Sequence, residues 1–160
     1  MQWELITDII LITSIVTMGI FVLLGLYQWI TPKSFKKIDK RLRCLPIPFI
    51  LLGITYIIFE KFVILNTRPN GSGEPSFPST HTMIVATIFF LVMMMLPKYV
   101  KNKYVRFVLD LIMIILIGLT ASGRVWANMH WPVDVIGGLA FAFIFTEVYY
   151  FAVHHKKAKK

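Results

Sequence analysis

The stretch IILITSIVTMGIFVLLGLYQWI, residues 9–30, contains 22 residues and no charged side chain. A helix needs about 20 apolar residues to cross the hydrocarbon core of a bilayer. The stretch therefore predicts a transmembrane helix. Glu4 and Asp8 precede it, without any lysine or arginine, whereas a cleaved signal peptide begins with basic residues. We therefore expect this first helix to be retained.

Four further apolar runs follow the first, over residues 44–65, 79–96, 107–122 and 131–153. We expect Pro97 to stop the third run, because proline lacks a backbone N–H and interrupts helices. Backbone polar groups in lipid must find their partners within the chain, which favours helical spans. The sequence predicts one all-α domain over residues 1–160, a polytopic transmembrane bundle of about five spans.

The basic residues of this chain, which carries a net charge of +9, cluster between the apolar runs. Six lie in residues 33–43, four in 98–106 and four in 156–160, which is 14 of the 17. Five spans place all three groups on one side, and loops rich in lysine and arginine stay cytoplasmic. We expect an outside N-terminus, a cytoplasmic C-terminus, contacts with anionic headgroups and no nucleic-acid partner.

Residue types that would hold a metal or a cofactor are scarce. Cys44 is the single cysteine, which excludes an internal disulfide and a cysteine-based zinc cluster. The sequence contains no HExxH pattern, and the polar clusters described next hold too few carboxylates for a magnesium site. We expect neither a metal nor a cofactor.

The first polar cluster is KFVILNTRP, residues 61–69. Lys61 and Arg68 are seven residues apart, so on a continuous helix they would share one face, with Pro69 ending that helix. A charge inside an apolar run is costly unless it faces a cavity. The alternative is that Lys61 merely extends to the interface and pairs with Glu60.

The second cluster is FPSTHT, residues 77–82. Pro78 followed by Ser79, Thr80 and His81 is typical of a helix start, where a serine or threonine caps the first turn. The free N–H groups and the positive dipole of a helix start form an anion site. The alternative is a plain helix cap with His81 at the interface.

The third cluster is RVWANMHWPVD, residues 124–134, between the last two apolar runs. Pro132 suits the first turn of a helix, which would place His130 and Asp134 one turn apart on one face. A carboxylate at that spacing is able to hold one imidazole nitrogen and leave the other free as a nucleophile or base. Arg124 adds a planar fork suited to phosphate oxygens. The alternative is a purely structural histidine–aspartate pair.

All three clusters fall on the outer side of the predicted bundle. Cations and hydrogen-bond donors without a metal suit a phosphoryl group, whose transfer depends on positioning and charge stabilisation. A non-enzymatic transporter or scaffold would distribute its polar residues along the spans, whereas here they concentrate at one end. The pattern therefore favours an enzyme.

The spacing of these residues resembles the three motifs of the type 2 phosphatidic acid phosphatase (PAP2) superfamily of membrane lipid phosphatases. The matching residues lie in a core of residues 61–134 and are Lys61, Arg68 and Pro69; Pro78, Ser79 and His81; and Arg124, His130 and Asp134. Two positions depart from the motifs, since Thr80 replaces a glycine and Gly123 replaces a serine. Five spans instead of the usual six imply that one N-terminal helix of the family is absent.

The resemblance implies a metal-independent phosphoryl transfer through a phosphohistidine. His130 would attack phosphorus while Asp134 holds its ring, and His81 would protonate the leaving oxygen. The implied phosphate-binding residues are Lys61, Arg68, Ser79, Thr80 and Arg124.

The expected substrate is a lipid phosphate or diphosphate, met at the extracytoplasmic side of the cell membrane. We favour an isoprenyl diphosphate such as undecaprenyl or dolichyl diphosphate, because the short loop 66–79 offers little surface for an elaborate headgroup. Phosphatidylglycerol phosphate or phosphatidic acid is the alternative substrate, and transfer to an acceptor other than water the alternative reaction. A vanadate haloperoxidase is disfavoured by the membrane-spanning composition, and no oligomeric state is predicted.

Overall fold

The computed structural model describes residues 2–31 and 38–155. Its helices are α1 (Gln2–Ile30), α2 (Lys40–Arg43), α3 (Pro46–Lys61), α4 (Thr80–Tyr99), α5 (Lys103–Trp126) and α6 (Pro132–His154). With α2 and α3 taken as one span, five segments of this described part of the chain are long and apolar enough to cross a membrane. Within the described residues the only β pairing is an isolated bridge between Thr67 and Pro75. The prediction of an all-α bundle with five spans is confirmed.

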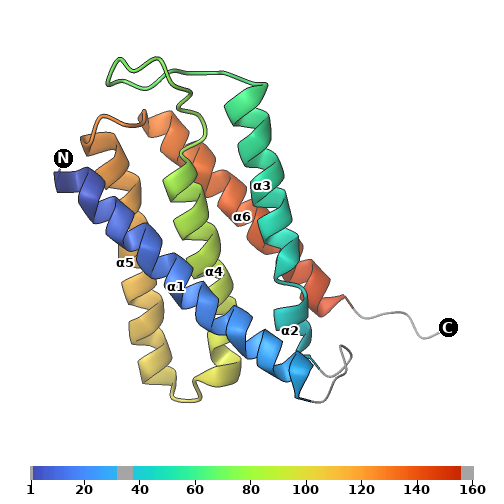
Figure 1. The fold of residues 1–160 in the computed structure, drawn as a ribbon. Coiled ribbons are helices and arrows are strands. Elements are labelled where there is room, and N and C mark those ends of the chain that lie inside the picture. Colours follow the sequence, from blue (N-terminus) through green and yellow to red (C-terminus); the bar gives the residue numbers. More distant parts are fainter. Residues whose placement is uncertain (1, 32–37, 156–160) are drawn as a thin grey trace.

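Helix α4 forms the centre of the bundle (Figure 1). It packs against α1, α5 and α6, while α3 packs mainly against α6. Apolar side chains of α4 such as Met83, Leu91 and Met95 are fully buried, whereas Leu23 of α1 and Phe107 of α5 are exposed. Large apolar side chains on the outer faces are expected where lipid takes the place of water.

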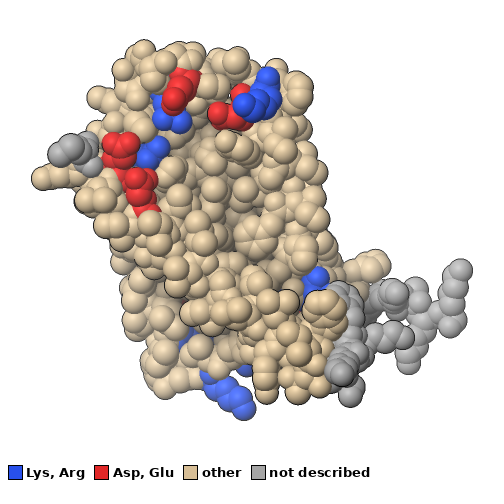
Figure 2. Space-filling view, in the orientation of Figure 1, with Lys and Arg blue, Asp and Glu red and all other residues tan. Residues whose placement is uncertain are grey.

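The two ends of the bundle differ in charge. The start of α1, the connection from α3 to α4 and the connection from α5 to α6 lie together at the upper end in Figure 1. Acidic and basic side chains both appear at that end, and further basic side chains appear at the lower end (Figure 2). Asp39 pairs with Lys98 at the lower end and so joins the start of α2 to the last turn of α4. The predicted basic groups of residues 33–37 and 156–160 lie outside the described residues.

Two helices extend beyond their predicted limits. Helix α1 begins at Gln2 and not at Ile9, so Thr7 and Asp8 belong to it. Helix α4 continues through Pro97 to Tyr99, so the prediction that Pro97 stops it is wrong. Proline removes one amide donor, and this close to the helix end the loss is small. The N–H of Val100 still donates to the Leu96 carbonyl at 2.8 Å.

Helix α3 ends at Lys61, eight residues before Pro69. The prediction that Lys61 and Arg68 share a helical face is therefore wrong. The residues that follow include Val63 and Ile64, whose β-branched side chains lower helix propensity. The loop pairs with itself instead, and the N–H of Arg68 donates to the Glu74 carbonyl at 3.0 Å.

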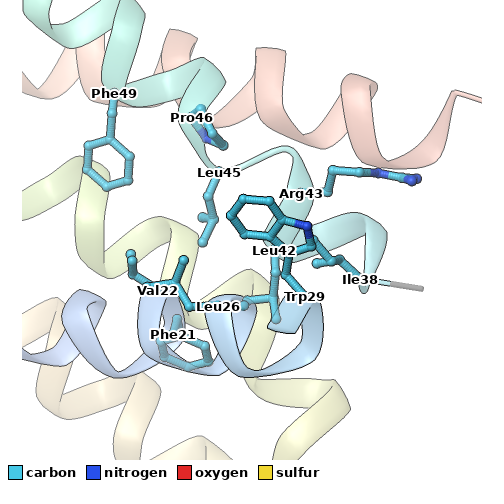
Figure 3. A pocket seen from close by; sticks show the side chains of 11 residues that line it. Phe21, Val22, Leu26, Trp29, Ile38, Leu42, Arg43, Leu45, Pro46 and Phe49 are labelled. Atoms are coloured by element: carbon cyan, nitrogen blue, oxygen red, sulfur yellow. The ribbon is translucent and has the colours of Figure 1, made fainter. Parts of the chain in front are cut away.

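Apolar hollows separate α1 from α3. One of about 330 Å³ lies beside α2 at the lower end, where Val22, Trp29, Leu42 and Phe49 line it (Figure 3). A second, of about 600 Å³, shares Val22 and Phe49 and reaches Ile84 of α4. Together they form an apolar groove between α1 and α3, with α4 as part of its wall.

Candidate active site

His130 lies in the connection between α5 and α6 and is only 4% exposed. Its Nδ1 contacts the backbone carbonyl of Ser76 at 2.8 Å. A carbonyl only accepts hydrogen bonds, so Nδ1 carries the proton and Nε2 keeps a lone pair. Burial lowers the pKa of His130 to about 4, and the nearby positive charge of Arg124 contributes. The ring is therefore neutral at pH 7, the form that a nucleophile requires.

We expected Asp134 to hold the His130 ring by a hydrogen bond. In the structure this hydrogen bond is not formed. Its Oδ2 is 3.8 Å from Nδ1 of His130, which is beyond hydrogen-bonding distance. Oδ2 instead accepts the N–H of Trp131 at 2.8 Å, and Oδ1 accepts from the Asn66 amide at 3.3 Å. Asp134 thus caps α6 and acts on His130 through its charge, while the Ser76 carbonyl fixes the ring.

Two arginines provide donors without partners. Arg124 lies in the last turn of α5 and is 3% exposed, and Arg68 pairs through Nη1 with Glu74 at 3.0 Å. Within the described part of the chain, Nε of both arginines is buried and has no hydrogen-bond partner. Both guanidinium groups lie close enough to His130 for their charges to affect it. Buried N–H donors without partners suit an oxyanion such as a phosphoryl group.

The start of α4 faces the same region. Thr80 lines a small polar cavity together with Arg68, Ser76 and His130. The first N–H groups of a helix have no intrahelical acceptors, so this end of α4 is able to bind an anion. The hydroxyl of Ser79, however, is fully buried and lies 3.0 Å from the Thr82 hydroxyl. The Ser79 hydroxyl thus already has a partner in the first turn of α4, and its role as a phosphate ligand stays a prediction.

Lys61 is exposed at the C-terminal end of α3. The α3 residues that line the polar cavity are Tyr56, Phe59 and Glu60. Among the described residues the cavity thus brings Arg68, Thr80 and His130 together and does not include Lys61. The free volume is about 20 Å³, room for about one water molecule.

His81 lies in the first turn of α4, and its Nε2 is 2.9 Å from Oδ1 of Asp8 on α1. Asp8 is not among the residues predicted for the site, because the first helix was expected to begin at Ile9. The signal that could have identified it is a carboxylate at the outer end of a long apolar run, on the side where the motifs gather. Arg124 also approaches this carboxylate, with Nη1 3.7 Å from Oδ1.

Gly123 allows α1 to approach α5 closely. A Cβ atom at this position would lie 2.7 Å from Cγ2 of Thr7. Beside it the rings of Trp3 and Trp126 are in contact, with their centroids 4.6 Å apart. The Thr7 hydroxyl lies 3.4 Å from Nη1 of Arg124. The space that a serine at position 123 would occupy is thus filled by Thr7.

This contact predicts that Gly123→Ser destabilises the protein. Overpacking a tight contact costs about 1–3 kcal/mol, so the thermal unfolding temperature in detergent should fall. Thr7→Ala removes the opposing methyl group, and the double variant Thr7→Ala/Gly123→Ser should recover part of the loss. Equal destabilisation in the single and double variants would contradict the contact.

Comparison with known proteins assigns this chain to a family. The model of the PAP2 superfamily matches residues 18–158. The chain belongs to the PAP2 superfamily. The matched region contains every predicted site residue from Lys61 to Asp134, whereas Thr7 and Asp8 lie before it.

Two relatives show how far the similarity extends. The chain is 28% identical over 126 residues to a protein from Sulfolobus acidocaldarius named undecaprenyl-diphosphatase, an alignment that covers 70% of this chain and 57% of the relative. The fold resembles the crystal structure of a transmembrane PAP2 type phosphatidylglycerolphosphate phosphatase from Bacillus subtilis. That match has a TM-score of 0.68 at 18% identity and covers 93% of this chain and 75% of the other.

Proposed function

We propose that this protein is a membrane phosphatase that hydrolyses a lipid phosphate or diphosphate through a phosphohistidine. The observation that carries the proposal is the state of His130, whose Nδ1 donates to the Ser76 carbonyl and whose Nε2 is left as a free nucleophile. The guanidinium groups of Arg68 and Arg124 nearby have buried donors available for phosphoryl oxygens. Membership of the PAP2 superfamily supports the assignment.

In the first half of the reaction, Nε2 of His130 attacks phosphorus and a P–N bond forms. The bond from phosphorus to the leaving oxygen breaks, and His81 supplies a proton to that oxygen. The charge on the phosphoryl group spreads over its oxygens in the transition state. Arg68, Arg124 and the amides at the start of α4 are placed to stabilise this charge.

In the second half, a water molecule attacks phosphorus and the P–N bond breaks. The water gives a proton back to His81, His130 recovers its lone pair, and inorganic phosphate is released. The carboxylate of Asp134 stabilises the positive charge that the His130 ring carries while it is bonded to phosphorus. These steps use protein side chains and water alone, so we expect no metal requirement.

We favour an isoprenyl diphosphate as the substrate. The similar protein from Sulfolobus acidocaldarius is named undecaprenyl-diphosphatase. The apolar groove between α1 and α3 offers space for a lipid tail. Phosphatidylglycerol phosphate, the substrate in the name of the similar Bacillus subtilis structure, and phosphatidic acid are the alternatives, and a phosphotransferase reaction is the alternative chemistry.

Phosphate release from a panel of lipid substrates in detergent tests this function. The panel contains undecaprenyl and dolichyl diphosphate, phosphatidylglycerol phosphate and phosphatidic acid, and the isoprenyl diphosphates should give the highest kcat/KM. Activity should persist in EDTA, and vanadate, which mimics five-coordinate phosphorus, should inhibit. The proposal would be refuted if none of the substrates released phosphate. Phosphate that appears on an added alcohol and not in solution would indicate a phosphotransferase.

Arg124→Lys tests whether the guanidinium grips phosphate or only supplies charge. Lysine keeps the positive charge but loses the fork that binds two oxygens. We expect kcat to fall on the order of 10²-fold, as when a single transition-state donor is removed. Arg106→Lys, at the opposite end of α5, is the matched control and should retain activity. Near-normal turnover of Arg124→Lys would assign that residue a structural role.

We also propose that the site faces outward, because positively charged loops stay cytoplasmic. The test uses single cysteines at Ser72, in the α3–α4 connection, and at Lys101, in the α4–α5 connection, after replacement of Cys44. An impermeant thiol reagent on intact cells should label position 72 and spare position 101. The reverse labelling would invert the orientation.

A further inference from the structure

The start of α1 adds a carboxylate to the site. Oδ1 of Asp8 is 2.9 Å from Nε2 of His81, and its side chain is about half exposed. The contact of Trp3 with Trp126 and of Thr7 with Gly123 fixes this part of α1 against α5. The position of Asp8 therefore follows from packing between helices.

Two other carboxylates near the site have different partners. Asp134 caps the first turn of α6 through the N–H of Trp131, and Glu74 pairs with Arg68. Asp8 is the acid in contact with His81 among the described residues. Within those residues Nδ1 of His81 has no hydrogen-bond partner, so it is the ring nitrogen available to exchange a proton.

We propose that Asp8 is the positioning residue of the acid–base histidine, and that it accepts the Nε2–H of His81 throughout the reaction. This inference rests on the proposed phosphatase function. With Nε2–H held by Asp8, the proton that moves is the one on Nδ1. It passes from Nδ1 to the leaving oxygen when the phosphohistidine forms, and a proton from the attacking water returns to Nδ1 when the phosphohistidine is hydrolysed.

Asp8 also offsets the positive charge around His81. The charged groups that act on His81 are Asp8 from α1, Arg124 from α5 and Arg68 from the α3–α4 connection. Two of the three are cations, which oppose a positively charged imidazole. The carboxylate of Asp8 favours the charged imidazole that donates the proton, and it holds the ring in one tautomer when that proton has left.

Asp8→Asn tests the charge in this pair. We expect kcat for a lipid phosphate to fall on the order of 10²-fold, less than the roughly 10⁴-fold lost when a fully buried triad aspartate is replaced. The alkaline limb of the pH–rate profile should move to lower pH, because the charged imidazole loses its carboxylate. Hydrolysis of p-nitrophenyl phosphate should be much less affected, because its leaving group needs no proton. Asp8→Glu should retain most of the activity.

Two controls separate positioning from a general effect on folding. Glu4→Gln makes the same change of charge one turn earlier on α1 and should leave kcat and the pH profile unchanged. The double variant Asp8→Asn/His81→Ala should be no slower than His81→Ala, because the proposed role of Asp8 requires the His81 ring and its 3.7 Å approach to Arg124 is too long for a hydrogen bond. Losses that multiply in the double variant, or an Asp8→Glu variant as impaired as Asp8→Asn, would overturn the proposal.

A measurement without turnover distinguishes this proposal from the function itself. In protein with ¹⁵N-labelled histidine, the His81 signals are assigned by their absence from His81→Ala. Wild-type His81, when neutral, should carry its proton on Nε2, and Asp8→Ala should give a mixture of tautomers. An unchanged tautomer in Asp8→Ala would overturn the role of Asp8 even in an active enzyme. A wild-type protein that hydrolyses nothing but shows the tautomer change would instead contradict the phosphatase function.

Discussion

His130→Ala should abolish turnover and prevent formation of any covalent phosphoenzyme. The loss should be on the order of 10⁴-fold or more, because removal of a nucleophile leaves only binding and charge stabilisation. The measurement is acid-labile phosphoprotein after rapid quenching, together with steady-state phosphate release. His154→Ala, which changes a histidine at the far end of α6, is the control and should retain both signals.

The pH dependence of the same signal follows from the burial of His130. Its pKa is lowered to about 4 by burial and by the charge of Arg124, so the nucleophilic neutral form predominates at every pH above about 4. The wild-type protein should therefore still form phosphoprotein at pH 5, where a histidine with an ordinary pKa near 6.5 is mostly protonated. Phosphoprotein that disappears between pH 7 and pH 6, or that persists in His130→Ala, would remove the assignment.

His81→Ala should give a loss that depends on the leaving group. General acid catalysis contributes about 10²–10⁴-fold, and we expect a loss of this size for a lipid monophosphate, whose alkoxide needs a proton as it departs. The loss should be smaller for a lipid diphosphate, which expels a phosphate oxygen. It should be smallest for p-nitrophenyl phosphate, whose phenolate leaves unprotonated. Turnover of the three substrates is measured with the same protein preparation.

The outcome also reports on the second half-reaction. Phosphoprotein that accumulates in His81→Ala with p-nitrophenyl phosphate would show that water activation has become limiting. An equal loss of activity on all three substrates, without accumulated phosphoprotein, would contradict the role of His81 as the leaving-group acid.

The bundle could be predicted from the sequence because it depends on apolar length. The run of residues 9–30 and the four that follow it favour helices whatever their neighbours are, because a helix satisfies the backbone polar groups of each segment within that segment. The residue at which a helix ends depends on competition between continuing the helix and pairing within the loop. The number of apolar residues in a run does not predict the outcome of that competition. Helix α3 illustrates this, because the loop after Lys61 pairs with itself and Arg68 leaves the helix.

The candidate site was predicted where side chains carry its chemistry, as with His130 and Arg124. Two contacts of the site could not be predicted from the sequence, for different reasons. The group that holds His130 is the backbone carbonyl of Ser76, and a carbonyl is present at every position of any sequence. Asp8 meets His81 only because two helices distant in sequence pack together, and that packing is a property of the folded bundle.

The groove between α1 and α3 has a consequence for how such a protein samples its substrate. Ile84, which lines the groove, lies one turn below His81 on α4. A lipid with its tail in this groove would reach the site by sliding sideways within the leaflet, without passing through water. The rate would then follow the mole fraction of substrate among the surrounding amphiphiles. Dilution with inert detergent at constant bulk substrate would slow hydrolysis, although neither protein nor substrate concentration in the tube has changed.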